Sequence, residues 1–167
     1  MVIVPAFHDY VALDIAAKLA GHEIVETPEE GIELFVVGAH LRGQPLHHQL
    51  TSRGARFVGP ARTTRDYRLV ALGTVPPKPG LVRDAGHGAL IEGEVYRLSA
   101  AHLGSFLSEL PEPMSLGPVT LSDGGTVVGF SCAFDSASVG KDITDFGGWR
   151  AYLASAENLP AGGYMSR

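Results

Sequence analysis

The chain has 167 residues, of which 45% are hydrophobic and 19% charged, and this composition excludes an intrinsically disordered protein. A formal net charge of −5 and scattered arginines argue against nucleic-acid binding, which needs a basic patch. Glycine (21 residues) and proline (11 residues) together make up about 19% of the chain, against the roughly 12% typical of proteins. This excess excludes a helix bundle and favours many turns. No apolar run reaches the roughly 18 residues of a membrane span, and the single Cys132 fits a reducing compartment, so we expect a cytoplasmic protein.

The first predicted element is a helix over residues 9–20. Val11, Ile15 and Leu19 recur at four-residue spacing and form one apolar helical face. The polar stretch that follows is typical of a linker. Residues 1–30 are therefore predicted to form a helical extension and linker, and residues 31–167 the main domain.

A strand, a turn and a helix are predicted next. Residues 32–37 are apolar and rich in β-branched side chains, which predicts a buried strand. The turn that follows is bracketed by Gly38 and Gly43. A helix is predicted over 45–53, because Pro45 suits its first position and Gly54 can end it.

The rest of the chain alternates short apolar runs with turns. Strands are predicted over 55–59, 67–72 and 90–98, with a hairpin over 116–130, a rigid proline-rich loop over 73–80, and helices over 100–109 and 148–155. Ser99 is the expected cap of the first of these helices. This order of elements predicts an α+β domain around a mixed or barrel-like sheet.

The turn between Gly38 and Gly43 carries the clearest signal for chemistry. A chain that leaves a buried strand through a glycine-flanked turn exposes several backbone N–H groups, and such a nest can bind a carboxylate or a phosphate. His40 lies in this turn and titrates near neutrality when unperturbed, so it could donate or accept a proton. The alternative is an ordinary tight turn with an exposed histidine.

Other polar residues give weaker signals. His47 and His48 would point about 100° apart on a helix, and no cysteine or histidine set has zinc spacing, so no metal site is predicted. Glu92 and Glu94 would lie about 7 Å apart on one strand face. A solvated face is expected there rather than an acid–base pair. Cys132 is predicted to be a core residue rather than a reactive thiol.

Four sequence blocks resemble the C-terminal domain of bacterial and fungal allophanate hydrolases, in the same order as in that domain. They are FVVGAHLRGQPLHHQL (35–50), GTVPPKPGLVR (73–83), ALIEGEVY (89–96) and DITDFGGWRAYL (142–153). The domain is similar in fold to the γ-glutamyl cyclotransferases, so the resemblance implies an α+β, γ-glutamyl cyclotransferase-like mixed β-barrel or sheet with flanking helices. Residues 106–113 lack the Leu-Asp-x-x-Glu spacing of the cyclotransferases, which disfavours their chemistry.

The resemblance also implies a reaction. In allophanate hydrolases an amidase-signature domain releases ammonia from allophanate, and the C-terminal domain is implicated in decarboxylating the N-carboxycarbamate that remains. The 167 residues hold no amidase-signature stretch. We therefore expect a cofactor-free protein that assists this second step of urea-related nitrogen metabolism on a small carboxylated substrate, beside a separate amidase-signature protein.

By the same resemblance His40 is assigned as the proton donor, because a carboxylated nitrogen must gain a proton as it loses CO2. The residues assigned to substrate binding belong to the turn, to the helix after it and to the proline-rich segment: Gly38, Ala39, Leu41, Gly43, His47, Lys78 and Pro79. His47 stands where the family commonly has asparagine.

Two alternatives stay open. The chain could be a cyclotransferase-fold enzyme that acts on another small carboxylated amine, such as a γ-glutamyl compound. It could instead be a non-catalytic module that assembles with a separate amidase. The chain could also form a homo-oligomer. Neither nucleic acid nor a membrane is an expected partner.

Overall fold

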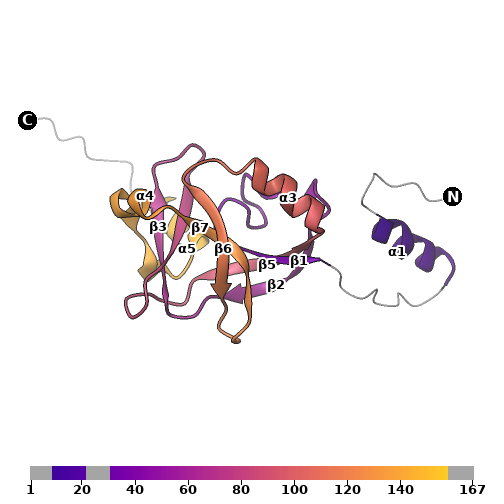
Figure 1. Ribbon diagram of the computed structural model, residues 1–167, viewed down its shortest axis with the longest axis horizontal. Coiled ribbons are helices and arrows are strands. Elements are labelled where there is room, and N and C mark those ends of the chain that lie inside the picture. Colours follow the sequence, from indigo (N-terminus) through magenta and orange to yellow (C-terminus); the bar gives the residue numbers. More distant parts are fainter. Residues whose placement is uncertain (1–8, 22–30, 158–167) are drawn as a thin grey trace, which may run out of the picture.

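The structure is a computed structural model that describes residues 9–21 and 31–157 (Figure 1). Helix α1 (Asp9–Leu19) confirms the predicted N-terminal helix. Its apolar side chains Ile15 and Leu19 are exposed. Most of the predicted linker lies outside the described residues. None of the described helices is long and apolar enough to cross a bilayer.

The larger sheet has five strands in the order β2-β5-β1-β7-β6. They are β1 (Ile32–Val36), β2 (Arg56–Arg62), β5 (Glu92–Leu98), β6 (Met114–Thr120) and β7 (Thr126–Cys132). Strand β1 lies in the middle, antiparallel to β5 and parallel to β7. Leu34, Phe35 and Val36 are fully buried there, as the apolar run predicts.

The smaller sheet has three strands in the order β4-β3-β8: β4 (Lys78–Arg83), β3 (Tyr67–Leu72) and β8 (Lys141–Asp142). The proline-rich loop predicted over 73–80 is wrong in its second half, because Lys78 and Pro79 begin β4 and Pro79 lies opposite Ala71. An edge strand tolerates proline when the missing N–H would point away from its neighbour. The predicted β3 strand is confirmed.

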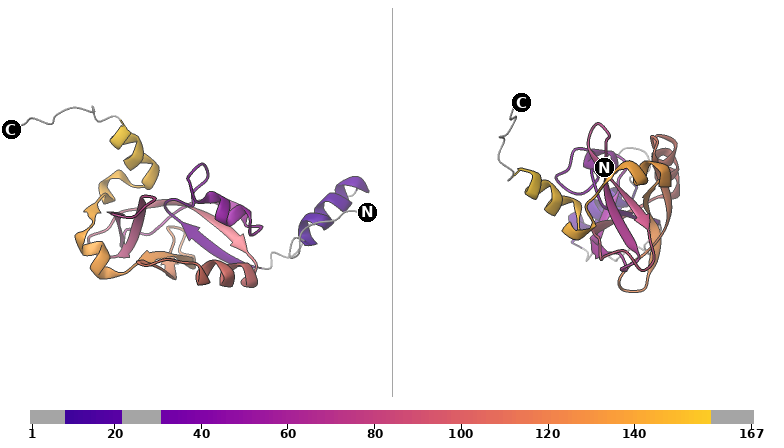
Figure 2. Two further views of the ribbon diagram at one scale, coloured as in Figure 1. Left: turned by 90° about the horizontal axis from the view of Figure 1, so that it is seen from above. Right: turned by 90° about the vertical axis from the view of Figure 1, so that its left-hand side faces the viewer.

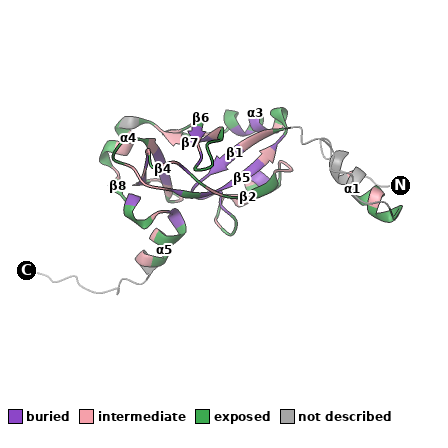
Figure 3. Cartoon of the chain, turned by 90° about the horizontal axis from the view of Figure 1, so that it is seen from below, coloured by how far each residue is buried: buried purple, intermediate pink, exposed green. Residues whose placement is uncertain are grey.

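The two sheets pack against each other without closing into one barrel over the described residues. Strand β4 comes so close to β7 that a Cβ atom added at Gly80 would lie 2.4 Å from the Sγ atom of Cys132. The α+β, γ-glutamyl cyclotransferase-like class is confirmed, in its mixed-sheet rather than its closed-barrel form. Figure 3 shows that the buried residues gather on the strands between the sheets.

The helices are short and flank the sheets: α2 (His47–Thr51), α3 (Ala100–Ser108), α4 (Phe134–Val139), the 3₁₀ turn η1 (Thr144–Phe146) and α5 (Trp149–Glu157). Helix α3 lies near one end of the sheets, and α4 and α5 lie near the other (Figures 1 and 2). Ser99 caps α3 as predicted, accepting a hydrogen bond from the His102 N–H. Helix α2 is shorter than the helix predicted over 45–53, because residues at both of its ends form turns instead, and the sequence does not predict α4.

Candidate functional site

The turn after β1 is closed by its own backbone hydrogen bonds. The Leu41 N–H donates to the Gly38 carbonyl over 3.0 Å, and the Leu46 N–H donates to the Ala39 carbonyl over 2.8 Å. Gly38 is required by close packing, because a Cβ atom there would lie 2.3 Å from the Cδ atom of Pro79. The turn is therefore fixed in shape by the chain itself and held against β4.

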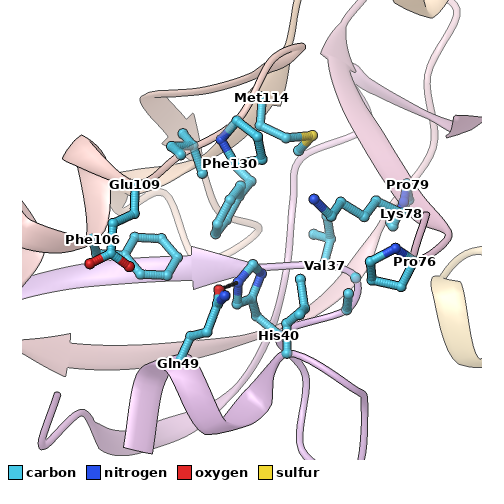
Figure 4. Close-up of a pocket in the computed structure, with 15 residues that line it drawn as sticks. Val37, His40, Gln49, Pro76, Lys78, Pro79, Phe106, Glu109, Met114 and Phe130 are labelled. Carbon is cyan, nitrogen blue, oxygen red and sulfur yellow. Dashed lines mark hydrogen bonds between the residues drawn. The ribbon is translucent and has the colours of Figure 1, made fainter. Parts of the chain in front are cut away.

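His40 is buried in this turn and lies between two aromatic rings (Figure 4). Its ring stacks on Phe130 at 4.9 Å between centroids and meets Phe106 edge-on at 5.2 Å. Its Nε2 atom lies 2.9 Å from the Oε1 atom of Gln49. Since an amide oxygen can only accept, Nε2 carries the hydrogen and Nδ1 carries the lone pair.

His40 lines a cavity. No described residue forms a hydrogen bond with its Nδ1 atom. Since no fully buried side-chain nitrogen of the described residues lacks a partner, Nδ1 is not fully buried. Burial lowers the pKa of His40 from 6.5 to about 4, opposed by the Gln49 hydrogen bond and reinforced by the positive charge of Lys78. The expectation that this ring titrates near neutrality is therefore wrong, and the imidazole is neutral at pH 7.

The cavity beside His40 has a volume of about 220 Å³, enough for a small molecule, since a water takes about 30 Å³. Lys78 reaches into it from β4, and its walls are mostly apolar (Figure 4). It brings together five of the predicted site residues: Gly38, Ala39, His40, Lys78 and Pro79.

Three other predicted residues do not line this cavity. Leu41 is 2% exposed and packs in the core, and Gly43 is exposed at the end of the turn with a φ of +79°. His47 is not among the residues that line the cavity, and its Nε2 atom lies 3.2 Å from the Tyr96 hydroxyl. Only the first half of the turn, residues 38–40, therefore lines the cavity.

Sequence reasoning missed the residues that hold His40. Gln49, Phe106 and Phe130 come from α2, α3 and β7, and only the packing of these elements brings them together. Arg53 adds a second layer, donating from Nη1 to the Gln49 carbonyl over 3.0 Å and pairing with Glu109. The nine-residue spacing of His40 and Gln49 carries no signal, because the turn between them is irregular.

The prediction of a solvated strand face is confirmed for Glu92 and wrong for Glu94. Glu92 is exposed and pairs with Arg62, whereas only 4% of the Glu94 side chain is exposed. Glu94 accepts hydrogen bonds from the Arg42 N–H, the Tyr96 hydroxyl and the Arg150 guanidinium over 2.8–2.9 Å.

These contacts keep Glu94 ionised. Burial alone would raise its pKa, but the hydrogen bonds from Arg42, Tyr96 and Arg150 outweigh burial, so the pKa of Glu94 is lowered. The backbone N–H of Arg42 in the turn thus binds a carboxylate of the protein itself, that of Glu94. Glu94 anchors the end of the turn opposite to His40.

The remaining polar groups indicate no further reactive centre. Within residues 9–21 and 31–157, no three His, Cys, Asp or Glu side chains are grouped to hold a metal ion. Cys132 is half-buried at the end of β7, where burial raises the pKa of its thiol. A raised pKa disfavours the thiolate, which agrees with a packing role.

The fold is that of the γ-glutamyl cyclotransferases. A solved γ-glutamyl cyclotransferase superposes with a TM-score of 0.51, covering 83% of this chain and 93% of that one, at 14% identity, a level that shows the fold alone. Residues 32–154 match the allophanate hydrolase C-terminal domain family. The chain belongs to that family.

Its relatives in that family are much longer proteins. The chain is 40% identical over 141 residues to the urea amidolyase of Lachancea kluyveri, which covers 81% of this chain and 8% of the relative. The crystal structure of the Kluyveromyces lactis urea amidolyase superposes with a TM-score of 0.75 at 37% identity, covering 83% of this chain and 9% of that one. The chain thus spans less than a tenth of the length of these relatives.

Proposed function

We propose that the cavity beside His40 binds N-carboxycarbamate and assists its decarboxylation, the second step of allophanate breakdown. One observation carries the proposal: His40, whose Nδ1 atom has no hydrogen-bond partner among the described residues, and Lys78 line the same small cavity. A dicarboxylated amine offers a nitrogen that needs a proton and carboxylates that need a cation. The family and its relatives named allophanate hydrolase and urea amidolyase support this substrate class.

The bound substrate supplies the condition for proton transfer. N-carboxycarbamate carries two negative charges, which stabilise the imidazolium form and raise the pKa of His40 above about 4. The ring then takes a proton from solvent and donates it from Nδ1 to the substrate nitrogen. Gln49 acts as a positioning residue, because its oxygen keeps the hydrogen on Nε2 and the reactive position on Nδ1.

The bond changes balance without a cofactor. As the nitrogen gains the proton, the C–N bond to one carboxylate breaks, its electron pair passes to nitrogen, and CO2 leaves. The product is carbamate, which yields ammonia and a second CO2 after another protonation. The apolar walls at Phe106, Phe130 and Pro79 favour neutral CO2 over the carboxylate, since a charged group is costly to keep in apolar surroundings.

A separate amidase-signature protein supplies the substrate in this proposal. The urea amidolyase relatives are more than ten times longer than the matched segment, so the domain works there as part of a larger protein. Two alternatives are another carboxylated amine as substrate and a non-catalytic assembly module, and the same assay separates the second of them from decarboxylation.

The test is CO2 release in an allophanate assay that contains a purified amidase. Addition of this protein should raise the rate of CO2 release above that of the amidase alone, after subtraction of spontaneous carbamate decay. An unchanged rate would reject the proposed decarboxylation. A complex between the two proteins together with an unchanged rate would favour the assembly module instead.

A further inference from the structure

A second cavity, which the proposed function does not use, opens on the other side of the turn after β1. Its volume is about 520 Å³. Three guanidinium groups lie at its edge, from the turn, from the end of β2 and from the start of α5: Arg42, Arg62 and Arg150. Glu92 and Glu94 from β5 complete its charged lining, so the cations outnumber the carboxylates.

Buried Glu94 fixes two of these arginines in place. Its Oε1 atom accepts from the Nε atom of Arg42 over 3.4 Å and from the Nη2 atom of Arg150 over 2.9 Å. Arg150 also donates from Nη2 to the Arg42 carbonyl over 2.8 Å. The guanidinium of Arg42 lies 3.8 Å above the centre of the Phe57 ring. Both groups are therefore ordered before any ligand arrives, which lowers the entropy lost on binding.

The same arginines keep donors unused. Arg62 contacts Glu92 through Nη2 alone, Arg42 uses only Nε, and Arg150 uses only Nη2. Among the described residues the other guanidinium N–H groups of these three have no protein acceptor. About half of each side chain is exposed, so the donors are accessible. The first turn of α5 borders the cavity and adds its partial positive charge.

We propose that this arginine cavity binds a small oxyanion, a metabolite that carries a carboxylate or phosphate group. Guanidinium groups form paired hydrogen bonds with the two oxygens of such groups, and donors fixed around one cavity provide several pairs at once. The cavity is large enough for a whole small metabolite. This proposal stands independently of the reaction at His40, because the two cavities use different side chains.

The test is titration of the isotope-labelled protein with inorganic phosphate and, separately, with malonate, followed by NMR of the arginine Nε–H resonances. Sodium chloride at matched ionic strength is the reference. Specific binding shifts the resonances of Arg42, Arg62 and Arg150 at concentrations where chloride has no effect. The stronger of the two probes distinguishes a phosphate ligand from a carboxylate ligand.

Substitutions test whether the arginine cavity is the binding site. Arg62→Gln should weaken binding about tenfold, the loss expected for one charge-assisted hydrogen-bonded contact, while the exposed Arg83→Gln leaves it unchanged. Lys78→Gln, which alters the cavity beside His40, should also leave these arginine shifts unchanged. The proposal is overturned if both probes act like chloride, or if Arg62→Gln binds as tightly as the unchanged protein.

Discussion

His40 donates its Nε2–H to the side-chain oxygen of Gln49 over 2.9 Å, and this contact determines which ring nitrogen can react. Because Gln49 occupies Nε2, only Nδ1 can exchange a proton with a molecule in the cavity. Gln49 itself is held through its backbone carbonyl by Arg53. The reactive nitrogen is thus positioned by a chain of contacts from α2.

Changing this acceptor should shift the pKa of His40 in a known direction. Gln49→Glu places a carboxylate beside the Nε2–H group and should raise the pKa of His40 well above 4. Gln49→Met removes the hydrogen-bond acceptor and should lower the pKa of His40 further. NMR titration of the His40 ring measures both values. Equal pKa values in the two variants would show that Gln49 does not govern the ring.

The low pKa of His40 predicts a loss of stability in acid. In the unfolded chain the ring titrates near 6.5 and in the folded chain near 4, so between these values the unfolded state binds more protons. The free energy of unfolding should therefore fall as pH decreases from about 6.5 to 4, by about 3 kcal/mol from this residue.

The measurement is urea denaturation at pH 7 and pH 4 for the unchanged protein and for His40→Asn. Other acidic groups affect both proteins alike, so the difference between them isolates His40. The unchanged protein should lose the extra stability, and His40→Asn should not. Parallel losses in both would contradict burial of a neutral imidazole.

Removal of the charge on Glu94 should destabilise the protein strongly. Glu94→Gln keeps the size but leaves the Arg150 guanidinium and the Arg42 N–H without a carboxylate, and losing a hydrogen bond to a charged group costs about 1.5–3 kcal/mol. The exposed Glu92→Gln is the matched control and should change the free energy of unfolding by less than about 0.5 kcal/mol. Chemical denaturation compares them, and equal effects would refute the anchoring role of Glu94.

Lys78 should contribute affinity rather than stability. Lys78→Gln removes the ammonium group from the cavity beside His40, and binding of malonate there should weaken about tenfold. The shift of the His40 ring resonance with malonate concentration reports this site separately from the arginine cavity. Lys141→Gln, an exposed change on β8, is the control. An unaltered malonate affinity in Lys78→Gln would show that Lys78 does not contribute to binding in this cavity.

The elements that sequence predicts best are those whose signal is local. The β-branched run of β1, the strand β3 and the Ser99 cap of α3 each depend on neighbouring residues, and the structure confirms them. The prediction of a loop over 73–80 is wrong at the edge strand β4. Proline excludes ladder hydrogen bonds only where its missing N–H faces a neighbouring strand, and a sequence does not show which side that is.

The site is predictable from the sequence only in part, because some of its properties depend on residues that are distant in the sequence. His40 and the turn follow from glycine spacing and family resemblance, but the burial that lowers the pKa of His40 comes from Phe106 and Phe130, more than sixty residues away. The burial of Glu94 likewise depends on Arg150, which α5 supplies from near the end of the chain. Long-range packing decides which of two similar carboxylates, Glu92 or Glu94, is solvated.

The most direct test of the account is the rate of CO2 release from allophanate, in the presence of a separate amidase, by His40→Asn. The exposed His87→Asn is the matched control, and both variants should fold. We predict that His40→Asn lowers CO2 release to the spontaneous rate while ammonia release by the amidase continues, and that His87→Asn matches the unchanged protein. CO2 release by His40→Asn at the unchanged rate would contradict the assignment of His40 as the proton donor.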